Sequence, residues 1–134
     1  MKAIVNCSLC PLGAITHLKN GEILADLFLN SLMKKVVEEI LMILPENISI
    51  DFDEAFDLIE QIIQQSASHK CSMLQDVENG RRTEIDSLNG AIVVIAASQG
   101  VKVPLNVQLT EIVKKLTEEK YPKELAILDL RKLS

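Results

Sequence analysis

Apolar residues recur at intervals of three and four along most of the chain, as they do on one face of an α-helix. The clearest series ends at Pro45 and consists of Leu29, Leu32, Met33, Val36, Val37, Ile40 and Leu44. It predicts one long amphipathic helix that starts between residues 21 and 25, after the turn-forming Asn20-Gly21-Glu22. A second amphipathic helix is predicted from the spacing of Phe52, Phe56, Ile59 and Ile63, with Asp51 and Asp53 available as caps.

The second half of the chain carries helix boundary signals of its own. A short helix is expected from Ser72 to Glu78, with Asn79-Gly80 as its stop. Residues 91–98 are apolar enough for a buried strand, but a capping-box pattern at 83–86 and helical spacing beyond it favour one helix over 83–100. Pro104 suits the first turn of another helix, and a short one is expected after Pro122.

These patterns together predict the fold class. Residues 48–50 are compatible with an extended segment, yet no strand is required anywhere, and no linker or repeat divides the chain. We therefore expect a single all-α domain over residues 1–134.

Composition narrows the possible surroundings and partners. The net charge is −5 and the basic residues form no stripe, so nucleic acid is not an expected partner. No apolar run approaches the length of a membrane span, and the first residues do not resemble a secretory leader. The three cysteines are an odd number, which favours reduced thiols. We expect a cytoplasmic protein that does not enter a membrane.

Cys7 and Cys10 form a C-x-x-C pair near the start of the chain. On a helix the two thiols share a face, which suits a reactive thiolate or half of a zinc site. Zinc needs two further ligands, and the candidates His17, His69 and Cys71 form no second metal-binding pair. Packing of the cysteines as small apolar residues is the favoured interpretation, and no metal site is predicted.

Several polar residues stand where the apolar periodicity does not require them, and such residues suit a small-molecule site. They are Asn6, Asn20, Ser72, Glu84 and Asn89. Each also has a structural explanation, such as a turn for Asn20 or the first turn of a helix for Glu84. The five glycines do not form a dinucleotide-binding fingerprint. The spacing alone leaves these alternatives open.

Six stretches in a constant order and spacing resemble the C-terminal domain of the ketopantoate reductase family, from Lys2 to about Leu116. They are KAIVNC at 2–7, PL at 11–12, NGE at 20–22, SMLQD at 72–76, TEIDSLNG at 83–90 and VPLN at 103–106. The resemblance implies a helical domain similar to the C-terminal domain of 6-phosphogluconate dehydrogenase. In the family, an N-terminal Rossmann domain precedes it and the substrate lies between the two. These enzymes use NADPH to reduce ketopantoate, a small 2-oxo acid, to pantoate on the route to coenzyme A.

The same resemblance implies roles for individual residues. Lys2 matches the family lysine that protonates the nascent alkoxide, and Glu84 matches a glutamate that binds the substrate hydroxyl and steadies that lysine. Substrate-binding positions of the family are matched by Asn6, Asn20 and Ser72. Cys10 and His69 depart from the pattern, because the family commonly has asparagine at both places. A thiol does not reproduce the hydrogen bonds of an amide, so related 2-oxo acids remain candidate substrates.

Only the helical half of such an enzyme is present in this sequence. We expect it to be inactive unless a Rossmann domain, in the same chain or in a second one, supplies NADPH. The alternative is a stand-alone, non-enzymatic helical domain that binds a partner or forms a homodimer through apolar surface left exposed by the missing half.

Overall fold

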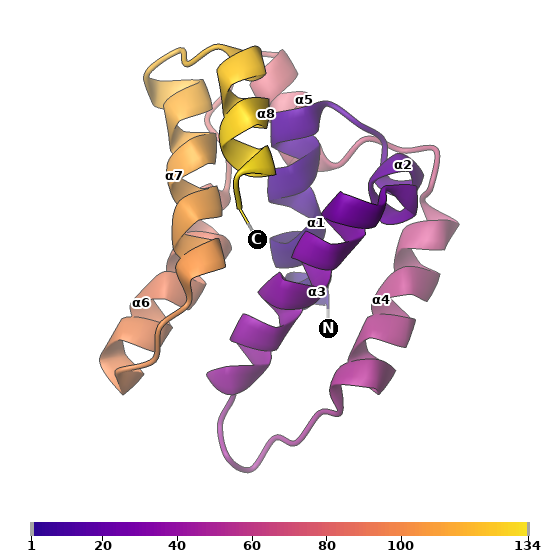
Figure 1. The fold of residues 1–134 in the computed structure, drawn as a ribbon, viewed down its shortest axis with the longest axis vertical. Helices are drawn as coiled ribbons and strands as arrows, with labels where there is room; N and C mark the ends of the chain where they lie inside the picture. Colours follow the sequence, from indigo (N-terminus) through magenta and orange to yellow (C-terminus); the bar gives the residue numbers. More distant parts are fainter. Residues whose placement is uncertain (1, 134) are drawn as a thin grey trace.

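Eight α-helices and one short 3₁₀ turn make up the regular structure of residues 2–133, the part of the chain that the computed structural model describes (Figure 1). In chain order they are α1 (Lys2–Thr16), α2 (Asn20–Ala25), α3 (Leu27–Met42), α4 (Phe52–Gln65), α5 (Ser72–Glu78), the 3₁₀ turn (Ile85–Ser87), α6 (Asn89–Gln99), α7 (Pro104–Glu118) and α8 (Lys123–Arg131). No strand occurs between residues 2 and 133. The prediction of a single all-α domain is confirmed.

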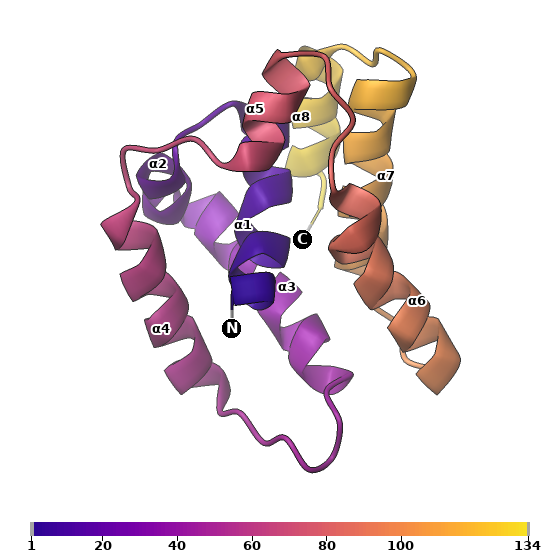
Figure 2. The ribbon, with the colours of Figure 1, turned by 180° about the vertical axis from the view of Figure 1, so that it is seen from behind.

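Helix α1 is the centre of this domain. Every residue from Cys7 to Ile15 is buried, and the helix packs against α3, α5, α7 and α8. Figures 1 and 2 show α4 and α6 on opposite sides of the α1 and α3 pair. The core consists mostly of aliphatic side chains, and their burial is the main favourable term in folding.

Several predicted boundaries are confirmed because the residues that set them act locally. The Asp51 carboxylate accepts the Glu54 N–H and caps α4. The short helix runs over Ser72–Glu78, and Gly80 follows it with a left-handed φ of 68°. Helix α7 begins at Pro104, and α8 follows Pro122.

Two predictions of a single continuous helix were wrong, because the structure divides each of them into two segments. The long helix predicted before Pro45 breaks at Asp26, whose extended backbone separates α2 from α3 and whose carboxylate accepts the Leu29 N–H at 2.9 Å. The helix predicted over 83–100 breaks at Leu88, so that only a 3₁₀ turn forms before the break and α6 makes up the rest. Thr83 does not form the expected capping box, because its hydroxyl accepts the N–H of Ile85, two residues along.

A buried chain of hydrogen bonds explains the second break and ties four helices together. Pro11 lies inside α1 and has no N–H to donate to the carbonyl of Cys7, four residues earlier. The side-chain amide of Asn89 donates to that carbonyl at 2.9 Å and also to Oδ1 of Asn106 at 2.9 Å. The Asn106 amide in turn donates to Oε1 of Glu39 at 2.8 Å. Asn89 meets these partners from the first position of α6.

A close approach of two backbones positions α2. The N–H of Gly21 donates to the carbonyl of Ala67 at 2.9 Å, and the N–H of Asn20 donates to the carbonyl of His69 at the same distance. A Cβ atom on Gly21 would lie 2.8 Å from the Cβ of Ala67, which is closer than two carbons can pack. Glycine therefore lets the loop after α4 hold the start of α2.

Candidate functional site

A pocket of about 400 Å³ lies beside the N-terminal half of α1. Three of its polar wall residues, Lys2, Asn6 and Cys10, follow one another at intervals of four and so share one face of that helix. Lys2 is exposed, Asn6 is half-buried and Cys10 is buried. The face therefore grades from a charged rim to an enclosed thiol.

Asn20, at the start of α2, gives the pocket a buried amide with an unused acceptor. The side chain is 6% exposed, and its Nδ2 donates to the hydroxyl of Ser66 at 3.2 Å. Its Oδ1 meets no hydrogen-bond donor within residues 2–133. An unpaired buried carbonyl oxygen is unfavourable, so this atom is suited to accept a hydrogen bond from a ligand.

The end of α4 and the start of α5 complete the wall of the pocket. Ser72, the first residue of α5, is exposed at the opening, next to the buried Cys71. The last turn of α4 adds Ile62 and Ile63 to the wall, and the C-cap residue Ser66 follows them. The pocket thus combines apolar side chains with polar groups from three helices and from the residue after α4, a composition common in small-molecule sites.

The structure brings four of the five predicted site residues to this pocket. Lys2, Asn6, Asn20 and Ser72 line it, whereas Glu84 does not. Glu84 is an exposed residue before the 3₁₀ turn, near enough to Cys10 for its charge to raise the pKa of that thiol. The side chain of His69 is exposed on the loop before α5 and is not a lining residue.

All three cysteines are free thiols, but they differ in environment. Burial raises the pKa of Cys7 to about 11. The Cys10 and Cys71 side chains are the largest influence on each other, raising the pKa of Cys10 and lowering that of Cys71. Cys7 is therefore an inert packing residue, as expected, while Cys10 and Cys71 form a pair.

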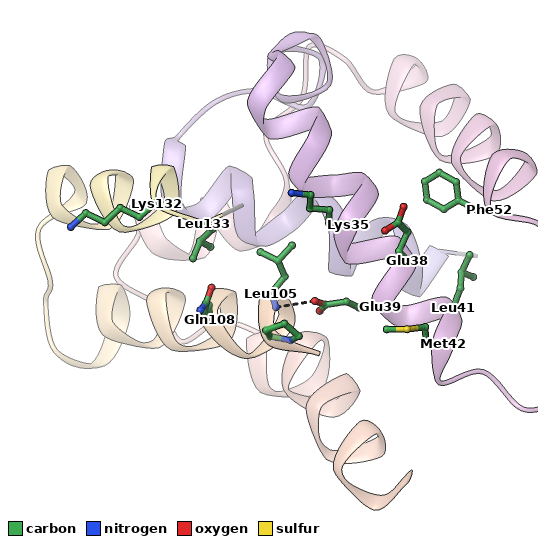
Figure 3. Close-up of a pocket in the computed structure, with 11 residues that line it drawn as sticks. Lys35, Glu38, Glu39, Leu41, Met42, Phe52, Leu105, Gln108, Lys132 and Leu133 are labelled. Atoms are coloured by element: carbon green, nitrogen blue, oxygen red, sulfur yellow. Dashed lines mark hydrogen bonds between the residues drawn. The ribbon is translucent and has the colours of Figure 1, made fainter. Parts of the chain in front are cut away.

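A larger pocket of about 700 Å³ lies on the side formed by α3, α7 and the end of α8 (Figure 3). Its buried acid is Glu39, whose two carboxylate oxygens accept the backbone N–H groups of Leu105 and Asn106 at 3.0 Å each. Those bonds serve the first turn of α7, where N–H groups lack partners within the helix. The Glu39 carboxylate therefore has a structural role, and the smaller pocket is the better candidate site.

Between residues 2 and 133 no group of three or more His, Cys, Asp or Glu side chains is arranged to hold a metal ion. Within the same range no helix has the length and apolar character that crossing a membrane requires.

Sequence reasoning missed Ser66 and the apolar wall of α4. A signal was available, because Ile59, Ile62, Ile63 and Ser66 lie at helical spacing, so that Ser66 continues the stripe of isoleucines with a hydroxyl. That Asn20 and Ser66 meet could not be read from spacing, because 46 residues separate them.

Comparisons with known proteins show which family this chain resembles. Residues 1–117 match the family model "Ketopantoate reductase PanE/ApbA C terminal". The chain is 40% identical over 114 residues to the 2-dehydropantoate 2-reductase of Pyrococcus horikoshii and 34% identical over 119 residues to that of Escherichia coli O157:H7. These alignments cover 84% and 88% of this chain but only 38% of each relative.

Solved structures with similar folds also match this chain over most of its length. A probable 2-dehydropantoate 2-reductase from Bacillus subtilis superposes with a TM-score of 0.80 at 32% identity, over 86% of this chain and 38% of that one. D-mandelate dehydrogenase, in a ternary structure with NADH and anilino(oxo)acetate, superposes with a TM-score of 0.82 at 30% identity, over 88% of this chain and 50% of that one. In each case the similarity is to part of a longer protein.

Proposed function

The chain belongs to the ketopantoate reductase PanE/ApbA family, and from that premise we propose that it is the substrate-binding and proton-donating half of an NADPH-dependent 2-dehydropantoate 2-reductase. The reaction would convert ketopantoate to pantoate in the cytoplasm. Because the chain spans about 38% of the length of the curated relatives it matches, this half would be inactive until a Rossmann domain joins it.

One observation carries the proposal: Lys2, Asn6, Asn20 and Ser72 line a single pocket although they come from three separate helices. The free Oδ1 of Asn20 is a ready acceptor for a substrate hydroxyl. The amide of Asn6 and the hydroxyl of Ser72 would bind the carboxylate and the other oxygens of a small 2-oxo acid. A positive charge at the rim suits an anionic substrate.

Lys2 would act on the carbonyl oxygen. When that oxygen gains negative charge, a nearby ammonium both stabilises the charge and neutralises it by proton transfer. By resemblance to the family, Glu84 would contact the substrate hydroxyl and steady Lys2, although it is not among the residues that line the pocket in this domain. Lys2 is exposed in this domain, so water would be excluded only when the second half covers the pocket.

The residues described here do not hold a dinucleotide themselves. Residues 2–133 contain no strand, and therefore no strand–turn–helix cradle for a pyrophosphate. The nicotinamide group, held by the Rossmann half, would supply the hydride to the substrate carbon.

The proposal is tested by supplying the missing half. The chain is fused behind the N-terminal domain of the Pyrococcus horikoshii relative, and ketopantoate-dependent loss of NADPH absorbance is followed. We expect turnover by the fusion and none by either half alone. Lys2→Ala should lower kcat by about 10²- to 10⁴-fold, the usual contribution of a general acid. Lys34→Ala, an exposed lysine on α3, is the matched control.

Binding to the unmodified chain gives a second readout that needs no turnover. Ketopantoate added to the isotope-labelled protein should shift the amide signals of Asn20 and Ser72. Asn20→Leu should abolish the ketopantoate-induced shift of the Ser72 signal. Gln108→Leu, in the larger pocket, should leave that shift intact. Shifts confined to the larger pocket, or Lys2→Ala with full activity in the fusion, would overturn the assignment.

A second candidate function has an observation of its own. The outward face of α6 is apolar: Val94 is 70% exposed and Ile95 is 44% exposed. Beside it, Val93, Val101 and Val107 line a shallow and largely apolar groove. Such a face fits a partner helix, and we propose a second copy of this chain. Light scattering should then give twice the mass of 14.9 kDa, and Val94→Glu should restore the monomer.

A further inference from the structure

Two thiols from distant parts of the chain meet at the wall of the smaller pocket. The Sγ of Cys71 lies 3.6 Å from the backbone carbonyl oxygen of Cys10, although 61 residues separate them. The same sulfur lies 2.8 Å from the place that a Cβ on Gly13 would take, so it rests directly on the surface of α1. Cys10 and Cys71 both line the pocket.

The two cysteines are in contact, and their surroundings differ. The Cys71 thiol donates to the backbone carbonyl of Cys10, and Cys71 is the N-cap residue of α5. The neighbouring Cys10 side chain and the backbone N–H groups of Leu74 and Met73 lower the pKa of Cys71. Because the thiolate is the reactive form of cysteine, Cys71 is the better nucleophile and Cys10 is placed to resolve its oxidation product. Both are nearly buried, at 7% and 4% exposure, so only a small reagent entering the pocket could reach them.

We propose that Cys10 and Cys71 form a reversible disulfide when the protein meets a peroxide. The Cys71 thiolate attacks one peroxide oxygen, the O–O bond breaks, and the released hydroxide takes up a proton to leave as water. The Cys10 thiol then attacks the resulting sulfenic acid, the S–O bond breaks, and a second water leaves. Two thiols are oxidised by two electrons, and one peroxide is reduced to two waters.

The bond would change the pocket, whatever the substrate. It would fasten α1 to the residue before Ser72 and remove two thiols from the wall. It would also close a loop of 61 residues, which restricts the unfolded chain and raises the denaturant concentration at the unfolding midpoint. The C-x-x-C spacing places Cys7 nearest to Cys10 along the chain, whereas the fold brings Cys71 into contact with Cys10.

The test uses the full chain, reduced and then treated with hydrogen peroxide. Remaining thiols are alkylated and the protein is digested with trypsin without reductant, which leaves Cys7 and Cys10 on peptide 3–19 and Cys71 on peptide 71–81. We expect these two peptides to run as one species, about 2 Da lighter than their sum, that dithiothreitol separates. A bridge within peptide 3–19, or two unlinked peptides, would overturn the proposal.

Single variants identify the cysteine on peptide 3–19. Cys7→Ser is the matched control, because this cysteine is on the same helix but does not line the pocket, and it should link to the same extent as the parent. Cys10→Ser should lose the linked species. If Cys7→Ser loses it instead, while far-ultraviolet circular dichroism shows a folded protein, the pairing is wrong. The unfolding midpoint of the oxidised Cys7→Ser protein should exceed that of its reduced form.

Discussion

The side chain of Asn89 should stabilise the fold chiefly because α1 contains a proline. Pro11 has no N–H for the Cys7 carbonyl, and Asn89 supplies the donor from another helix. Asn89→Ala removes that bond and the one to Asn106, in a fully buried place. Pro11→Ala restores an N–H that can reach the Cys7 carbonyl within α1. The two substitutions should therefore not be additive.

The expected magnitude follows from the bonds involved. Each buried hydrogen bond contributes about 0.5–1.5 kcal/mol, and the truncated side chain leaves a small cavity, so Asn89→Ala should lower the free energy of unfolding by about 2–4 kcal/mol. In a Pro11→Ala background, the Cys7 carbonyl, one of the two acceptors of Asn89, can accept the new N–H of residue 11 instead. The same Asn89→Ala substitution should then cost about 1 kcal/mol less.

Urea unfolding of the four proteins, followed by far-ultraviolet circular dichroism, measures this coupling. The cavity left by Asn89→Ala is present in both backgrounds, so it cancels in the cycle. If the effects of Asn89→Ala and Pro11→Ala add to within about 0.3 kcal/mol, Asn89 does not compensate for the proline and the reasoning fails.

Three further substitutions test other parts of the fold. Glu39→Gln leaves one buried N–H of α7 facing an amide donor and should lower the free energy of unfolding by about 1–3 kcal/mol. The neighbouring Glu38 is exposed, so Glu38→Gln should change little, and equal urea midpoints for the two variants would refute the role of Glu39. Gly21→Ala overpacks against the loop after α4, so it should lower the free energy of unfolding by about 1–3 kcal/mol and shift the amide signal of Asn20 in a nuclear magnetic resonance spectrum. Gly80→Ala is the control: it should cost only the left-handed backbone penalty of about 1 kcal/mol and leave the Asn20 signal in place. Burial, aided by the charge of a nearby lysine, lowers the pKa of His17 below 6.5. The unfolded chain therefore binds a proton more readily than the folded one, and the free energy of unfolding should fall as the pH drops below about 6.5. His17→Gln should flatten that part of the curve of stability against pH, and an unchanged slope would contradict the assignment.

The parts of the fold that could be predicted from the sequence are those whose boundaries depend on neighbouring residues. Pro104 and the Ser72–Glu78 helix are examples, because a proline or a glycine acts within one turn. The break at Asp26 also had a local signal, since an aspartate three residues before Leu29 is a typical cap. The break at Leu88 had none, because Asn89 is held by partners far away in the chain.

The candidate site was predictable to a different extent. Asn6, Asn20 and Ser72 came from the resemblance, and the structure places all three around one pocket. Spacing alone did not separate them from turn and cap residues. The thiol pair of Cys10 and Cys71 was out of reach, because which cysteines meet depends on how α5 docks on α1.

The proline at position 11 also constrains the order in which this domain can be completed. Within the domain α1 is synthesised before α6 and α7, yet the donor for the Cys7 carbonyl belongs to residue 89, and the support for that donor comes from residue 106. A nascent or truncated chain that ends before α7 would leave the central helix without its final brace. Long-range closure of this kind slows folding and exposes incomplete chains to aggregation. The central helix of this domain is thus synthesised well before the residues that complete its hydrogen bonds.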